Sequence, residues 1–89
     1  MSDLAAIVRA TRASANALAA MARHARDAAD ASAVIAHNHR QVAAGRIRPS
    51  TADIGNAIAL QRKATAMAAW KRASNKFDRA QITLARNPL

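Results

Sequence analysis

His37 and His39, followed directly by Arg40, are the residues of this chain whose types best suit metal binding or acid–base catalysis. On a helix, side chains two residues apart point about 200° away from each other, so these two imidazoles cannot share one metal ion. A zinc site also needs three or four ligands, commonly with thiolate or carboxylate help, and the surrounding residues 36–55 supply none except Asp53. We therefore interpret residues 36–55 as the bend between two helices, with His39 on an apolar side and His37 in solvent.

The acidic residues give no better support for catalysis. All five are aspartates, and Asp27 and Asp30 each follow an arginine by four residues, which is the spacing of an ion pair within a helix. The sequence contains no cysteine, no glycine-rich phosphate loop and no nucleophile elbow. We expect a non-enzymatic protein with no cofactor and no metal.

The composition favours one small helical domain over residues 1–89. Alanine fills 27 positions, while the sequence has only one Trp, one Phe and no Tyr. A chain of this size with so few large apolar side chains is close to the lower limit for an independent core, so we expect a second copy or a partner to complete it.

The N-terminal segment could be read as a targeting sequence. Residues 1–26 are amphipathic, contain arginine and serine, and are poor in acids, as in an organelle transit peptide. The same apolar pattern continues beyond residue 40, however, which a cleavable leader would not need. No run of 18 apolar residues occurs, so we expect no membrane span. We expect a folded cytoplasmic protein.

The few helix-breaking residues predict an all-α antiparallel two-helix hairpin that resembles a coiled coil. Glycine and proline occur only at positions 45, 49, 55 and 88. Ser2 followed by Asp3 suits a helix start, Gly45 suits a helix end, and Ser50 suits the cap of a second helix. We predict helix one at about 3–44, a turn at 45–50 and helix two at about 51–86. The low helix propensity of residues 37–39 leaves open a break there.

Apolar residues at steps of three and four predict how the two helices pair. A fold at residues 47–48 places residues opposite each other when their numbers add to 95. Trp70 then faces Ala25, and the polar pairs Ser14–Gln81 and His39–Asn56 would help to fix the register. The residues predicted to form the seam between the helices are Leu18, Ala25, Ile35, Leu60, Met67, Trp70, Phe77 and Leu84.

The charge points to an anionic partner. The net charge is +9, of which residues 46–89 carry +7. An ordinary soluble face mixes both signs, whereas the outward faces of these helices are rich in arginine and poor in acids. Arg72, Arg79 and Arg86 form a seven-residue ladder opposite Trp70, Phe77 and Leu84. The predicted anion-binding residues are Arg9, Arg12, Arg23, Arg72, Lys76, Arg79 and Arg86.

Three kinds of partner fit these features. Nucleic acid bound through its phosphates, without base specificity, fits a basic stripe along a helical rod. An acidic protein surface would satisfy the same arginines and make the chain an adaptor or inhibitor. The chain could also be a structural subunit of a helical assembly. Ile54 and Ile58 form an apolar patch turned away from Trp70, which we interpret as a possible self-association surface of a homo-oligomer.

Overall fold

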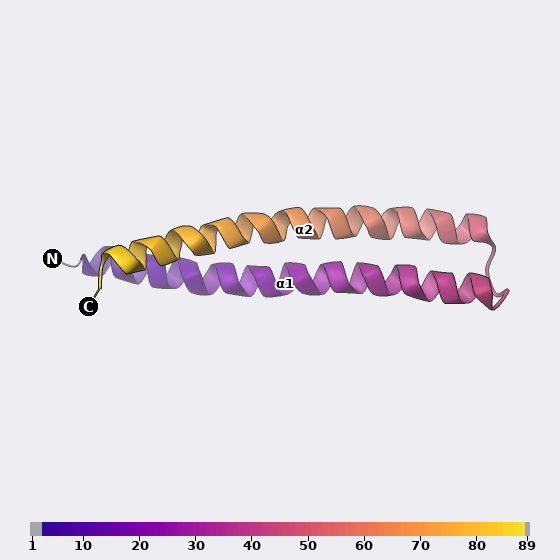
Figure 1. Cartoon of the computed structure of the whole chain (residues 1–89), viewed down its shortest axis with the longest axis horizontal. Coiled ribbons are helices and arrows are strands. Elements are labelled where there is room, and N and C mark those ends of the chain that lie inside the picture. The colour runs from indigo at the N-terminus through magenta and orange to yellow at the C-terminus, as the bar shows by residue number, and fades with distance from the viewer. Residues whose placement is uncertain (1–2, 89) are drawn as a thin grey trace.

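The computed structural model describes residues 3–88 and consists of two long helices joined by a short turn. Helix α1 spans Leu4–Ala43 and helix α2 spans Pro49–Arg86 (Figure 1). The all-α hairpin predicted from the sequence is confirmed, and no strand occurs among the described residues. The Cα radius of gyration is 19.6 Å and the extents are 67 × 15 × 14 Å. A compact domain of this length would have a radius of gyration of roughly 12 Å, so the hairpin is a rod.

Helix α1 begins and ends at the residues that the sequence indicated. The Asp3 side chain accepts a hydrogen bond of 3.1 Å from the Ala6 backbone N–H, which caps the first turn. At the other end Gly45 has a φ of 71°, the left-handed conformation that glycine adopts at little cost. Its N–H bonds to the Val42 carbonyl, and the next N–H bonds to the Gln41 carbonyl. This is a Schellman motif. The helix runs through residues 37–39 without a break.

Helix α2 begins earlier than predicted. Its cap is Arg48, whose backbone is extended and whose side chain makes no capping hydrogen bond, and Pro49 is the first helical residue. Proline suits this position because its φ is already helical and it has no N–H that needs a partner. The expectation that Ser50 caps the helix was therefore wrong, because Ser50 already lies inside it.

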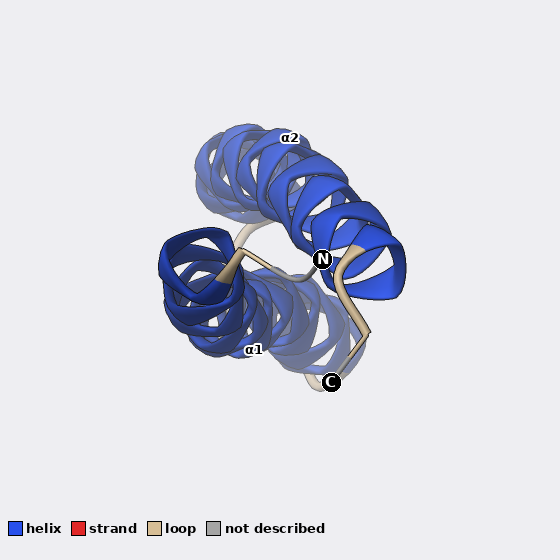
Figure 2. Ribbon diagram, turned by 90° about the vertical axis from the view of Figure 1, so that its left-hand side faces the viewer, coloured by secondary structure: helices blue, strands red, loops and turns tan. Residues whose placement is uncertain are grey.

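The buried layer between the helices is made almost entirely of alanine. Figure 2 shows the two helices side by side and wrapping around each other along the rod. The buried residues recur at steps of three, four and seven, the repeat of a left-handed coiled coil. Apart from Ser14 they are all alanines, and no larger side chain is fully buried among the described residues. The buried alanines are Ala10, Ala17 and Ala31 of α1 and Ala52, Ala59, Ala66, Ala73 and Ala80 of α2.

The predicted seam needs a correction, because several of its large side chains lie at the edge of the interface. Leu18 is 50% exposed, Leu60 and Met67 are each 56% exposed, and Trp70 is 39% exposed. Ala25 is also exposed, whereas Ile35, Phe77 and Leu84 are half-buried. In three cases the buried residue is the alanine one position earlier: Ala17, Ala59 and Ala66. Small side chains at these positions let the two backbones approach closely, and the bulkier neighbours are displaced to the flank.

The register between the helices agrees with the prediction at Ser14. Gln81 Nε2 donates a hydrogen bond of 2.9 Å to Ser14 Oγ, which confirms this polar pair. The second predicted pair was wrong by one residue. Asn56 Oδ1 accepts a hydrogen bond of 3.0 Å from Asn38 Nδ2, not from His39. The difference follows the same rotation of α1, which turns position 38 toward α2 and leaves His39 exposed.

Candidate anion-binding groove

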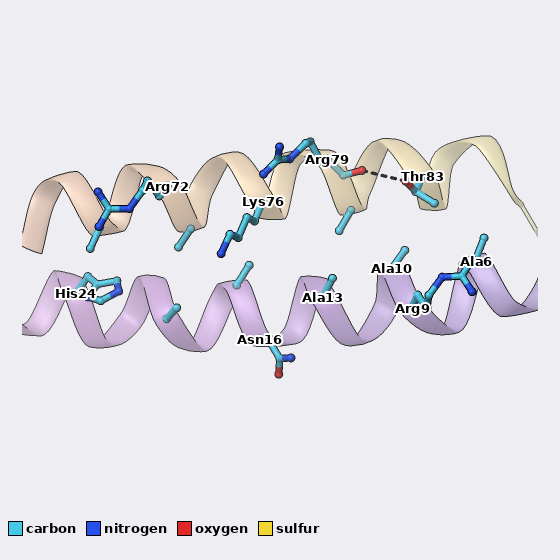
Figure 3. Close-up of a pocket in the computed structure, with 15 residues that line it drawn as sticks. Ala6, Arg9, Ala10, Ala13, Asn16, His24, Arg72, Lys76, Arg79 and Thr83 are labelled. Atoms are coloured by element: carbon cyan, nitrogen blue, oxygen red, sulfur yellow. Dashed lines mark hydrogen bonds between the residues drawn. The ribbon is translucent and has the colours of Figure 1, made fainter.

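The two helices form an open groove along one side of the rod. Its volume is about 930 Å³, and its floor consists of alanine methyl groups from both helices. Figure 3 shows α1 and α2 running side by side with the side chains that line this groove. The alanines that line it are Ala6, Ala10, Ala13, Ala17 and Ala20 of α1 and Ala69, Ala73 and Ala80 of α2. Alanine at all these positions keeps the groove open, because no long apolar side chain fills it.

Four cationic side chains border the groove and give it a single sign of charge. Arg9 comes from α1, and Arg72, Lys76 and Arg79 come from α2. Figure 3 shows Lys76 reaching from α2 toward α1, with Arg72 near the His24 end and Arg9 near the other end. No aspartate is among the lining residues. The cations are all exposed, so an anion can reach them without displacing protein.

The spacing of the α2 cations follows from helix geometry. Steps of four and three place Arg72, Lys76 and Arg79 on one side of the helix. They rise about 6 Å and then about 4.5 Å along the axis, so the outer two are about 10 Å apart in that direction. Within residues 3–88, no hydrogen bond or ion pair joins their charged groups to another described residue. Their charge is therefore not neutralised within the described chain.

The groove brings together some of the predicted anion-binding residues and not others. Arg9, Arg72, Lys76 and Arg79 line it, whereas Arg12, Arg23 and Arg86 do not. Arg12 follows the buried Ala10 by two residues, a turn of about 200°, so it points to the outer side of α1. Arg86 lies at the last residue of α2, beyond the end of the lining residues at Thr83. All three stay exposed on the surface of the rod.

Three polar lining residues were not predicted from the sequence: Asn16, His24 and Thr83. Asn16 lies seven residues after Arg9, and Thr83 lies seven residues after Lys76, so each repeats the helix position of a cation. His24 lies seven residues after the buried Ala17. A heptad assigned from alanines rather than from large apolar residues would have found all three.

Trp70 and Phe77 lie away from the groove. Trp70 and Met67 line a second, smaller pocket of about 300 Å³ together with Ala25, Ala28 and His24. Trp70 and Phe77 are absent from the lining of the basic groove. The groove can therefore hold phosphates or carboxylates through charge and hydrogen bonds, and His24 is the one ring among its described lining residues.

Comparison with known proteins finds no matching family model, no matching curated protein and no matching solved structure. Across residues 3–88, no three His or Asp side chains gather closely enough to hold a metal ion. Neither of the two described helices has a stretch that is long and apolar enough to cross a membrane.

Proposed function

We propose that this protein binds nucleic acid through the phosphate backbone, without base specificity, and that the alanine-floored groove is the contact surface. The observation that carries the proposal is the grouping of Arg9, Arg72, Lys76 and Arg79 around one groove that no aspartate lines. Lys and Arg that neutralise phosphates supply most of the affinity of sequence-independent binding. No catalytic step is part of this function.

The shape of the surface favours nucleic acid over an acidic protein. The residues that line the groove run from 6 to 24 of α1 and from 69 to 83 of α2, so its cations follow the axis of the rod for roughly 20 Å, which suits a polymer with regularly spaced phosphates. The separation of about 10 Å between Arg72 and Arg79 along α2 is comparable to the ~12 Å width of the major groove between the backbones of a DNA duplex. Neither Trp70 nor Phe77 lines the groove, and His24 alone among its described lining residues has a ring, so the groove lacks a row of stacking surfaces, which favours duplex over single-stranded nucleic acid. A cytoplasmic protein with an RNA or DNA duplex as its partner fits these features.

The decisive experiment measures duplex binding at several salt concentrations for Lys76→Ala and Lys71→Ala. Both lysines are exposed residues of α2, and both substitutions remove one charge. Lys71 lies about 140° around the helix from Lys76 and does not line the groove. We expect Lys76→Ala to weaken binding and to reduce the slope of log K against log salt by about 0.9. Lys71→Ala should leave the slope close to that of the unchanged protein.

The results also separate the alternative functions. Equal effects of the two lysine substitutions would show that the groove is not the contact surface. Absence of duplex binding even at low salt would contradict the proposal. Selective binding of an acidic protein, lost in the Lys76→Ala variant, would then favour the adaptor or inhibitor.

A structural subunit is the second candidate, and a different observation favours it. Leu18, Leu60 and Met67 are half-exposed or more although they are large and apolar, as expected of a chain that packs into a helical assembly. Spontaneous formation of large filaments by the isolated chain, together with absence of duplex binding, would support this function.

A further inference from the structure

Four of the exposed large apolar side chains lie on one flank of the hairpin. They are Leu18 of α1 and Leu60, Met67 and Trp70 of α2, and Met67 and Trp70 line the smaller pocket beside Ala25. Single exposed apolar residues are common on protein surfaces, but a contiguous patch marks an interaction site. We therefore expect another surface to cover the apolar side chains of this flank.

This apolar flank lies on the opposite side of the hairpin from the basic groove. Leu18, Leu60 and Met67 each follow a buried alanine by one residue, a turn of about 100° around the helix. Ala20 and Lys76, which line the groove, each follow a buried alanine by three residues, a turn of about −60°. The basic groove thus lies on one flank of the hairpin, and Leu18, Leu60 and Met67 lie on the other.

The exposed area is large enough for a standard interface. The chain exposes 6390 Å², whereas a compact chain of 9.4 kDa would expose roughly 5,000 Å². The excess of roughly 1,400 Å² follows from the rod shape and exceeds the ~800 Å² that each partner contributes to a standard protein interface. Because the buried residues among those described are alanines and Ser14, a second contact is also needed to bury any large side chain completely.

We propose that the occupant is a second copy of this chain, packed flank to flank in a four-helix bundle. The pocket at Ala25 and Ala28 is a hollow of small residues beside the bulky Met67 and Trp70. In a twofold contact the same patch meets itself, so the large side chains of one copy face the hollow of the other. The repulsion between two chains of charge +9 is limited, because the basic grooves end up on opposite outer sides of the bundle.

The dimer gives the protein two separated anion-binding grooves. A bundle with a groove on each outer side can hold two nucleic-acid segments at once and bridge them. This bridging rests on the proposed function, whereas the dimer itself does not. Bridging would raise the effective concentration of the second segment once the first is bound.

Sedimentation equilibrium of the full chain over a micromolar range tests the dimer. We expect a mass twice 9.4 kDa. Met67→Asp should weaken the dimer by roughly 100-fold or more, because it places a charge at the centre of the apolar contact. Ile58→Asp is the matched control, since Ile58 is 60% exposed on the same helix but does not line the smaller pocket. Circular dichroism at the same concentrations checks that both variants remain helical.

Fluorescence of the single Trp of the sequence, Trp70, provides a second readout. On dilution we expect its emission to shift to longer wavelength in the unchanged protein and in Ile58→Asp, as the indole becomes exposed to water. Met67→Asp should show the long-wavelength emission at all concentrations. A helical monomer throughout the range, or a dimer that Ile58→Asp disrupts and Met67→Asp does not, would overturn the proposal. The latter result would place the contact at Ile54 and Ile58.

Two duplexes with different labels test the bridging. The unchanged protein should bring both labels into one complex, and the Met67→Asp monomer should bind either duplex without joining them. If the dimer forms but no duplex binds, the proposed function fails while the dimer stands. If duplexes bind and no dimer forms, the dimer fails while the proposed function stands.

Discussion

Gln81 Nε2 donates a hydrogen bond of 2.9 Å to Ser14 Oγ and thereby joins residues that lie 67 positions apart in the sequence. Ser14 is the only polar residue in the buried layer of the described chain. The buried alanines of α2 repeat every seven residues, so a shift of α2 by one heptad would bury the same kind of side chain. The polar pair would lose its hydrogen bond in that shifted register. We infer that it helps to select one register among several of similar apolar packing.

A double-mutant cycle should detect this pair. Ser14→Ala and Gln81→Ala should be coupled by about 0.5–1.5 kcal/mol in the free energy of unfolding, the usual contribution of one hydrogen bond. Urea denaturation of the two single variants and the double variant gives the value. The cycle of Ser14→Ala with Gln61→Ala is the control, because Gln61 is exposed and makes no hydrogen bond with Ser14. Equal coupling in both cycles would contradict the assignment.

Enlarging one buried alanine should force the helices apart. Ala66 is 6% exposed at the centre of α2, and Ala66→Leu should lower the free energy of unfolding by about 1–3 kcal/mol through overpacking. Ala68→Leu adds the same atoms to an exposed position two residues away and should be close to neutral. Thermal unfolding followed by circular dichroism compares the two variants. Equal melting temperatures would argue against close packing at Ala66.

The two glycines should respond differently to substitution by alanine. Gly45 has a φ of 71°, so Gly45→Ala should cost about 1–2 kcal/mol of stability. Gly45→Asn should cost less, since asparagine tolerates this conformation better. Gly55 lies inside α2, where alanine gains about 1 kcal/mol of helix propensity. A Cβ at Gly55 would lie 3.0 Å from Asn38 Nδ2 and would oppose that gain. Urea denaturation should therefore show a larger loss for Gly45→Ala than for Gly55→Ala.

A carboxylate on the floor of the groove should weaken duplex binding. Ala13 lines the groove, and Ala13→Glu would place a negative charge among the cations. We expect an affinity loss of about tenfold or more, ~1.4 kcal/mol. Ala19→Glu makes the same change of net charge on an exposed part of α1 outside the groove and should have a smaller effect. Fluorescence anisotropy with a labelled duplex measures both. Identical losses would show that only net charge matters.

The ends of α1 were predictable because they depend on local residue types. The pairing of Ser14 was predictable because it depends only on which residue numbers lie opposite each other in the hairpin. Asp3 caps α1 through its side chain, and Gly45 ends the helix because it adopts the left-handed backbone conformation at little cost. The start of α2 was missed because Ser50 was preferred over Pro49, although proline at the first helical position needs no capped N–H.

The orientation of the helices about their axes was harder to predict. Large apolar residues such as Leu60 and Met67 were taken to mark the buried face, but close helix approach selected the alanines that precede them. Because the predicted buried face was displaced by one residue, the groove was not predicted either. The rotation of each helix about its own axis decides which side chains line the groove. Arg12 and Arg23 share the outward side of α1 with Arg9, and only the structure shows that Arg9 alone of these three lines the groove.

The ends of the described chain lie together at one end of the rod, where the Asp3 N–H bonds to Asn87 Oδ1 at 3.2 Å (Figure 1). A force that pulls these ends apart would break the contacts between α1 and α2 one after another, beginning at this hydrogen bond and ending at the turn. Each of these contacts is weak, because nearly all of the buried residues between the described helices are alanines. The hairpin should therefore unzip gradually under tension, without the single high force peak of a structure whose contacts are sheared together.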